Sequence, residues 1–454
     1  LKITTNQALN ANGQNLAAGN TTLSGGSVNL SGSQTGAANI GITATSGDVN
    51  TSNATVATAG TLSIAANVNS SQTLNNTQGV LSAGQLNVTV ANFNNTLGQA
   101  IQTGVGDTSI VLTSPTGTLN NTNGTIATNS ANLILSADIL TNIDGKIQHA
   151  GTDTLSIAAN ALTNLRGQIV GNHNATLQLA SLDNTQGSIY VRKDLGVSVS
   201  GAITNTGFIA AQGNTRITAS GLSSDTGSVL GAGVKTDGTL ANSGDLSITT
   251  TQTLTANGQN LAAGNTTLSG SSVNLSGSQT GGANIDITAT SGDVNTSSAT
   301  VATSGTTGLL HVVAKANASN AQTLNNQQGV LSAGQVNLEV SKLDNTLATI
   351  IAGYGGLNVA THAFDNTDGE LQSVGTGNLT VTADALTNVR GQIFSNRNAA
   401  LQLASLNNTQ GNVYAANNLG VTTTGAITNT GFIAAQGNIR AVMGELRRLD
   451  KPYK

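Results

Sequence analysis

The side chains that could carry out acid–base chemistry are few, and the densest group of them lies between residues 138 and 153. It consists of Asp138, Asp144, Lys146, His149 and Asp153. Cleavage of a glycosidic bond needs two carboxyl groups at a defined separation, or a metal ion together with a base. On a repeating fold these side chains could converge on one face and supply that chemistry. The pattern favours the simpler interpretation, a group of solvated surface charges.

The chain holds two copies of a long segment, and several charged residues change between the copies. The segment Leu162–Arg216 recurs as Leu386–Arg440, and His173 becomes Arg397 in the second copy. The further exchanges are Asp183 to Asn407, Arg192 to Ala416, Lys193 to Asn417 and Asp194 to Asn418. The repeated fold therefore does not require these charges.

Arg166 and Arg390 behave differently, because both copies retain this arginine in the motif R-G-Q-I. The retained arginines are candidates for contact with a partner. The alternative is a solvent-facing arginine whose aliphatic stem packs along a strand. No glycine-rich phosphate loop, calcium-binding nonapeptide or R-G-D triplet occurs, and the chain has no Cys and four scattered His. We predict no catalytic, cofactor-binding or metal-binding residues.

Composition restricts the class of protein that must position these side chains. Charged residues make up 8% of the 454 residues and aromatic residues 2%, so neither an ordinary soluble surface nor a wide aromatic core is expected. Hydrophobic residues reach 37%, too many for a disordered chain. The net charge of −4 and the lack of basic runs interleaved with aromatics exclude nucleic acid binding. No apolar stretch approaches the roughly 18–20 residues of a membrane helix.

A short repeat runs through both long copies, with the pattern L-x-N-x-x-G-x-aliphatic. Eight intervals of this repeat separate Leu74 from Leu240, which gives a mean of about 21 residues. Segments such as Leu155–Ala159 and Leu177–Ser181 follow the motif and alternate apolar and polar residues, as strands do. Each unit is too small to bury its own apolar face, so it must stack on its neighbours.

These features predict an all-β fold, a right-handed parallel β-helix (a solenoid) with coils of about 20 residues. Residues 1–440 are expected to form a continuous rod containing an internal duplication, 1–245 and 246–440. The middle of the second copy is 26 residues shorter, because the offset between copies falls from 250 to 224. A stack can lose about one layer in this way. Residues 441–454 break the pattern and are expected to be a tail without a packed role, or a basic tail that contacts a partner.

Stacking predicts ladders of equivalent side chains about 4.8 Å apart. The interior aliphatic ladders are Leu140, Leu162 and Leu182, and Ile147, Ile169 and Ile189. Asn142, Asn164 and Asn184 are expected to form an amide ladder, in which each side chain donates to one neighbour and accepts from the other. Gly145, Gly167 and Gly187 are expected where the turn needs either a positive φ or a close approach.

The combination of "LxNTxGxI", "AGNTTLSGxSVNLSGSQT" and "SGDVNTS" resembles the repeat region of filamentous haemagglutinins. These are very large exoproteins of the bacterial two-partner secretion pathway, and contact-dependent growth inhibition effectors share the repeats. The resemblance covers about residues 1–440. It implies a β-helical rod, export through an outer-membrane partner transporter, and a secreted or cell-surface location. The first residues have no signal-peptide pattern, so we expect an internal segment of a longer protein.

The resemblance leaves three functions open. The first is adhesion to receptors or glycans of host cells or other bacteria, through many weak contacts along a repetitive surface. The second is a passive stalk that presents a C-terminal toxin. The third and weakest is a β-helical polysaccharide-cleaving enzyme. The favoured reading is a non-enzymatic rod segment with no transmembrane span.

Overall fold

The structure is a computed structural model that describes residues 1–315 and 322–443. Its described residues form β-strands and turns, without a helix. The strands pair in parallel, apart from one isolated antiparallel bridge between Val234 and Leu240. The predicted all-β solenoid is thus confirmed. Residues 444–454, most of the predicted tail, lie outside the described residues.

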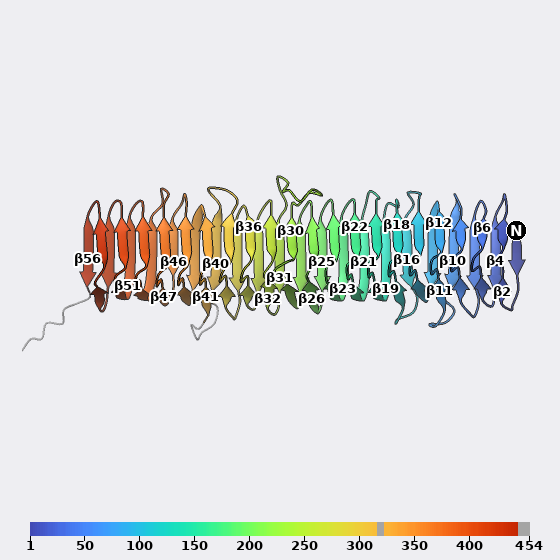
Figure 1. Ribbon diagram of the computed structural model, residues 1–454, viewed down its shortest axis with the longest axis horizontal. Coiled ribbons are helices and arrows are strands. Elements are labelled where there is room, and N and C mark those ends of the chain that lie inside the picture. Colours follow the sequence, from blue (N-terminus) through green and yellow to red (C-terminus); the bar gives the residue numbers. More distant parts are fainter. Residues whose placement is uncertain (316–321, 444–454) are drawn as a thin grey trace, which may run out of the picture. The chain divides into compact units, whose positions relative to one another are not determined.

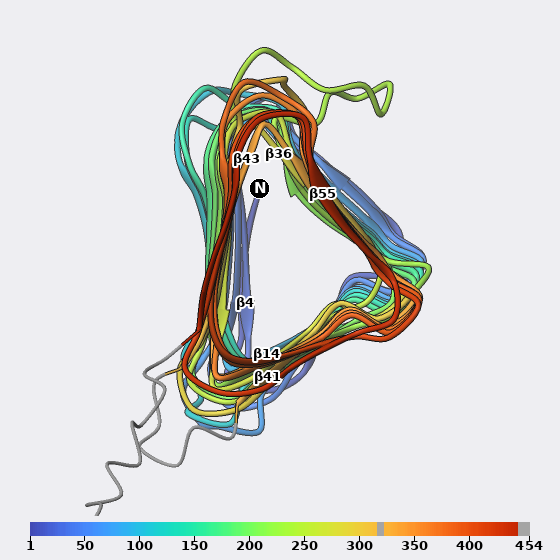
Figure 2. The same ribbon diagram turned by 90° about the vertical axis from the view of Figure 1, so that its left-hand side faces the viewer.

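The chain divides into two compact units, Leu1–Asp245 and Leu246–Lys454. Within each unit, successive turns place their strands side by side (Figure 1). An end-on view shows that a turn has a triangular outline, with one strand along each side (Figure 2). We call these the first, second and third strands of a turn.

In unit 1 the three strand types are distributed as follows. The first strands are β1 (Lys2–Thr4), β4 (Thr21–Gly25), β7 (Ile40–Ala44), β10 (Thr61–Ala66), β13 (Gln85–Val90), β16 (Thr108–Leu112), β25 (Leu195–Val199) and β28 (Thr215–Ala219). The second strands are β2 (Leu9–Asn10), β5 (Val28–Asn29), β8 (Val49–Asn50), β11 (Thr73–Asn75), β14 (Asn92–Asn94), β17 (Thr118–Asn120), β26 (Ala202–Asn205) and β29 (Gly221–Ser224). First and second strands are continuous in β19 (Leu133–Thr141), β21 (Leu155–Thr163) and β23 (Ala175–Asn184). The third strands are β3 (Gln14–Leu16), β6 (Gln34–Gly36), β9 (Thr55–Ala57), β12 (Val80–Ala83), β15 (Gln99–Gln102), β18 (Thr125–Thr128), β20 (Lys146–His149), β22 (Gln168–Gly171), β24 (Ser188–Val191), β27 (Phe208–Ala211) and β30 (Val229–Ala232).

Unit 2 repeats this arrangement. The first strands are β31 (Leu246–Thr250), β34 (Thr266–Gly270), β37 (Ile285–Ala289), β40 (Leu309–Ala314), β43 (Gln335–Val340), β46 (Leu357–Ala360), β53 (Leu419–Thr423) and β56 (Ile439–Met443). The second strands are β32 (Leu254–Ala256), β35 (Val273–Asn274), β38 (Val294–Asn295), β41 (Thr323–Asn325), β44 (Lys342–Asp344), β47 (Ala363–Asp365) and β54 (Ile427–Asn429). The continuous strands are β49 (Leu379–Thr387) and β51 (Ala399–Asn408). The third strands are β33 (Gln259–Ala262), β36 (Gln279–Gly282), β39 (Thr300–Thr303), β42 (Val330–Ala333), β45 (Thr349–Ala352), β48 (Glu370–Ser373), β50 (Gln392–Ser395), β52 (Asn412–Ala415) and β55 (Phe432–Ala435).

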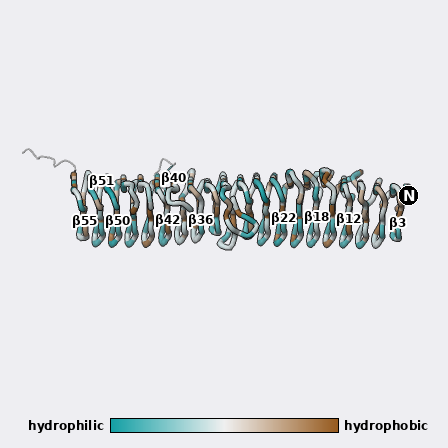
Figure 3. The backbone as a smooth tube through the Cα atoms, turned by 90° about the horizontal axis from the view of Figure 1, so that it is seen from above, coloured by the Kyte–Doolittle hydropathy of each residue, from teal (hydrophilic) through white to brown (hydrophobic). Residues whose placement is uncertain are grey.

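The core of each unit consists of aliphatic ladders between consecutive turns. Leu140 pairs with Leu162, and Leu162 pairs with Leu182. In the third strands Ile147 pairs with Ile169, and Ile169 with Ile189. All six side chains are at most 2% exposed, so each contributes roughly 1.5–3 kcal/mol by burial. Within the strands successive side chains point alternately inward and outward, so hydrophobic and hydrophilic residues are interspersed along the turns (Figure 3).

A ladder of buried asparagines lies where the second strand turns into the third. Nδ2 of Asn142 donates to Oδ1 of Asn164 at 2.7 Å, and Nδ2 of Asn164 donates to Oδ1 of Asn184 at 2.8 Å. In unit 2 the same ladder runs from Asn326 through Asn345, Asn366, Asn388 and Asn408, all buried, to an exposed Asn429. The direction of donation is constant, so each amide in a ladder interior both donates and accepts.

The glycine that follows each ladder asparagine is needed for close approach. A Cβ on Gly167 would lie 2.0 Å from the carbonyl oxygen of Asn142. Of the two alternatives expected at these glycines, close approach is confirmed, and the positive φ falls on the residue before them: φ is 51° at Asp144, 52° at Arg166 and 52° at Gln186. Side chains at this position point out of the turn and lie one above another.

Candidate functional site

Arg166 and Asp144 occupy the same positive-φ position in consecutive turns and form a bidentate ion pair. Nε of Arg166 donates to Oδ1 of Asp144 at 2.8 Å, and the Nη2 atom donates to Oδ2 at 2.7 Å. The Arg166 hydrogen bond lowers the pKa of the Asp144 carboxyl, and the carboxylate raises the pKa of the arginine. The arginine side chain remains 48% exposed.

Arg390 repeats this pair in unit 2. Its Nε donates to Oδ1 of Asp368 at 2.7 Å, and its Nη2 donates to Oδ2 at 2.5 Å. The pKa of Asp368 is lowered by the hydrogen bond from Arg390. Both arginines therefore have an intramolecular partner, and any contact with another molecule has to compete with it or use the remaining donors.

The charged group between residues 138 and 153 is spread around a single turn of unit 1. Asp138 lies in β19 at the corner between the first and second strand positions, and Asp144 lies at the corner between the second and third strands of the same turn. Lys146 begins β20 and is exposed, as is Asp153. His149 is buried, and its Nε2 lies 2.9 Å from the carbonyl oxygen of Ser130. Within the described residues, no hydrogen bond or ion pair joins two members of this group.

Two of the exchanges between the copies, Asp183 to Asn407 and Asp194 to Asn418, have a structural reason. Oδ1 of Asp183 accepts from the backbone and hydroxyl of Thr185, and Oδ1 of Asn407 accepts from Thr409 in the same way. Likewise, Oδ1 of Asp194 accepts from the backbone N–H of Asn214, and Oδ1 of Asn418 accepts from that of Asn438. An oxygen acceptor is needed at these positions, and a charge is not.

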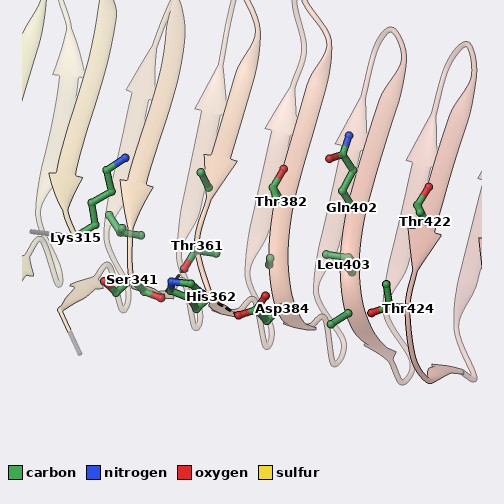
Figure 4. Close-up of a pocket in the computed structure, with 14 residues that line it drawn as sticks. Lys315, Ser341, Thr361, His362, Thr382, Asp384, Gln402, Leu403, Thr422 and Thr424 are labelled. Carbon is green, nitrogen blue, oxygen red and sulfur yellow. Dashed lines mark hydrogen bonds and ion pairs between the residues drawn. The ribbon is translucent and has the colours of Figure 1, made fainter. Parts of the chain in front are cut away.

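Unit 2 carries a groove of about 680 Å³ that sequence reasoning missed. The unit 2 groove lies at the corner between the first and second strand positions and crosses several successive turns, as Figure 4 shows. It is lined by Lys315, Val340, Ser341, Ala360, Thr361, His362, Thr382, Ala383, Asp384, Gln402, Leu403, Ala404, Thr422 and Thr424. Two consecutive outward residues, Asp384 and Ala385, interrupt the alternation of β49 at this corner, and small side chains leave it open.

The charged groups of the unit 2 groove are paired. Nδ1 of His362 lies 2.8 Å from Oδ2 of Asp384, in the next turn. Lys315 contacts Glu339, and this hydrogen bond is the main reason that the pKa of Glu339 is lowered. By contrast, the side chains of Thr382, Gln402 and Thr422 make no hydrogen bond within the described part of the chain. Oγ of Ser341 is buried and also lacks a partner there.

Unit 1 carries a matching groove of about 650 Å³ at the same corner. The unit 1 groove is lined by Leu112, Ser114, Pro115, Ser136, Ala137, Asp138, Ala158, Ala159, Asn160, Gln178, Leu179, Ala180, Ser198 and Ser200. An offset of 224 residues relates Gln178 to Gln402 and Leu179 to Leu403. The pair His362–Asp384 is replaced by Asp138 and Asn160, whose Nδ2 donates to Oδ1 of Asp138 at 2.5 Å.

The described residues hold no group of three or more His, Cys, Asp or Glu that could bind a metal ion. They also include no helix of the length and apolarity needed to cross a membrane. The arrangement offers paired charges and free polar side chains along two open grooves. That is the chemistry of a contact surface.

Comparison with known proteins shows what the repeats are similar to. The chain is similar to Toxin CdiA of Yersinia pestis. The two sequences are 38% identical over 243 residues, which is 53% of this chain and 7% of the relative's length. The match confirms the resemblance to haemagglutinin-type repeats that the motifs predicted. No protein-family model and no solved structure gives a significant match.

Proposed function

We propose that this chain is a stalk segment of a large exoprotein that is exported by the two-partner pathway and displayed at the bacterial surface. The observation that carries the proposal is the similarity to a protein named as a toxin, of which the 243 matched residues make up only 7%. In-register turns in each unit suit a stalk, because every added turn extends the stack without needing a wider core. The outer-membrane partner transporter belongs to the same proposal.

The stalk role is tested in the full-length protein, expressed with its partner transporter. Removing residues 1–440 should leave export intact and reduce inhibition of neighbouring cells in mixed culture, because the distal part is then presented closer to the producing cell. Surface display is measured with an epitope tag at the far end. Unchanged inhibition with normal display would contradict a stalk function for this segment.

Adhesion is the second candidate, and the two grooves favour it. Each presents polar side chains that have no intramolecular partner within the described part of the chain. Weak contacts at two sites on one chain gain avidity. Beads coated with the purified chain should attach to host or bacterial cells above the level of albumin-coated beads, and equal attachment would remove adhesion from the proposal.

A structural role also fits the acidic residues better than catalysis does. Asp144, Asp368 and Asp384 are each held by a cationic or imidazole partner rather than facing a second carboxyl group. Incubation with acidic and neutral polysaccharides is expected to release no new reducing or unsaturated ends. Their release would restore the enzymatic alternative.

A further inference from the structure

The two grooves share their position in the turn and the chemistry of their walls. Each extends over several turns, so it suits a linear ligand with a repeating unit rather than a compact one. Gln402 and Leu403 stand in unit 2 where Gln178 and Leu179 stand in unit 1. The outward positions of the flanking turn are hydroxyls in both, Thr422 in unit 2 and Ser198 in unit 1.

The groove side chains that have no hydrogen-bond partner indicate which kind of ligand suits the grooves. Thr382, Gln402 and Thr422 are exposed and unpaired among the described residues, and their hydroxyl and amide groups both donate and accept hydrogen bonds. Sugar hydroxyls have the same dual capacity. An extended peptide would bind mainly through its backbone, but the strands here already pair their backbone groups with adjacent turns.

The ionisable side chains that line the grooves restrict the class of ligand further. Among the residues that line the unit 2 groove, the basic side chains are Lys315, which pairs with Glu339, and His362, which pairs with Asp384. The unit 1 groove is lined by one ionisable group, the carboxyl of Asp138. An acidic polysaccharide would find no unpaired basic group in either groove and would meet a carboxylate in each, Asp384 in unit 2 and Asp138 in unit 1.

We propose that both grooves bind an extended neutral polysaccharide, with its chain crossing successive turns. The apolar floor, made of Ala383 and Leu403 in unit 2 and Ala159 and Leu179 in unit 1, contacts the C–H faces of the sugar rings. No phenyl, phenol or indole ring lines either groove, so each groove binds weakly. The two grooves on one chain together gain avidity. This inference rests on the adhesive part of the proposed function and gives it a ligand class.

The test measures binding of the purified 454-residue chain to immobilised dextran, laminarin and mannan, with heparin as the acidic comparison. Removing one amide, by Gln402→Ala or Gln178→Ala, should weaken binding about fivefold, in line with one hydrogen bond. The double variant should lose more than either single variant. Gln168→Ala with Gln392→Ala is the matched control, since these exposed glutamines are also related by 224 residues and lie outside both grooves.

A second pair of variants fills the grooves. Ala158→Trp and Thr382→Trp change exposed, equivalent positions, so folding should persist while binding is lost. The proposal is overturned if no neutral polysaccharide binds, if heparin binds more tightly, or if the filled grooves bind like the wild type. Coated beads that attach to cells equally with filled grooves would end the groove proposal and leave adhesion standing. Polysaccharide binding without cell attachment would support the groove proposal and contradict adhesion.

Discussion

At the scale of single residues, the asparagine ladder sets the register of the turns. Asn164 is fully buried, donates to Asn184 and accepts from Asn142. Asn164→Ala leaves Oδ1 of Asn184 without its donor and deprives Asn142 of its acceptor. We expect a loss of about 1–3 kcal/mol in the free energy of unfolding for each buried group left unpaired. Urea unfolding followed by circular dichroism measures this, with exposed Asn172→Ala as the control; equal losses would contradict a special role for the ladder.

The two arginine–aspartate pairs predict a pH dependence. Their bonded arginines lower the pKa of Asp144 and Asp368 in the folded state, below the ordinary value of about 3.9. A lowered carboxyl pKa stabilises the fold above the unfolded-state pKa, and this contribution disappears as the pH falls below about 4. Asp144→Asn with Asp368→Asn should therefore flatten the acid limb of a stability profile between about pH 4 and pH 2. An unchanged acid limb would show that the exposed pairs contribute nothing measurable.

At the scale of the turn, the ladder glycine is required by space. A methyl group on Gly167 would lie 2.0 Å from the backbone oxygen of Asn142 and 2.5 Å from Oδ1 of Asn164. Gly167→Ala should therefore open the local turn and create a new protease-sensitive site. Gly227→Ala is the control, because nothing lies within 4 Å of a Cβ there. Limited proteolysis with mass mapping distinguishes them, and equal resistance would contradict the close-approach explanation.

Whole turns are expected to be removable. Ala161 pairs with Ser181, and Leu162 with Leu182. Deletion of Leu162–Ser181 joins Ala161 to Leu182, so that Ala161 takes the place that Ser181 holds before Leu182. Leu140 would then stack on Leu182. The variant should fold with an unchanged β-sheet spectrum per residue and a cooperative unfolding transition. A disordered product would contradict stacking by interchangeable turns.

The sequence predicted the parts of the fold that the repeat period controls. An apolar residue or asparagine recurring every 20-odd positions must meet its equivalent in the next turn, which is where Leu162 and Asn164 lie. It did not predict that φ is positive at Arg166 rather than at Gly167, since glycine is the residue that adopts a positive φ without steric cost. The Asp144–Arg166 pair was also missed, although its spacing of 22 residues equals one turn. The grooves were not predicted, because they depend on the shape of the corner between the first and second strand positions rather than on residue type.

At the scale of the whole molecule, the chain is a duplicated solenoid for which we propose a stalk function. The duplication places equivalent grooves and ion pairs in both units. The continuous rod expected over residues 1–440 remains a proposal drawn from the repeat. What both the stalk and the grooves require is that consecutive turns lie directly over one another within each unit.

Engineered disulfides test that requirement most directly, because the chain has no cysteine of its own. Ser156 pairs with Thr176 in unit 1, and Thr380 pairs with Ala400 in unit 2, so their Cα atoms lie at the strand spacing of about 4.8 Å. Oxidation of Ser156→Cys/Thr176→Cys and of Thr380→Cys/Ala400→Cys should cross-link each pair, as shown by mass and by mobility on non-reducing gels. The shifted pairs Ser156→Cys/Gln178→Cys and Thr380→Cys/Gln402→Cys exceed the roughly 7 Å limit for a bridge and should stay reduced. Cross-linking of the shifted pairs in place of the registered ones would contradict the in-register stack.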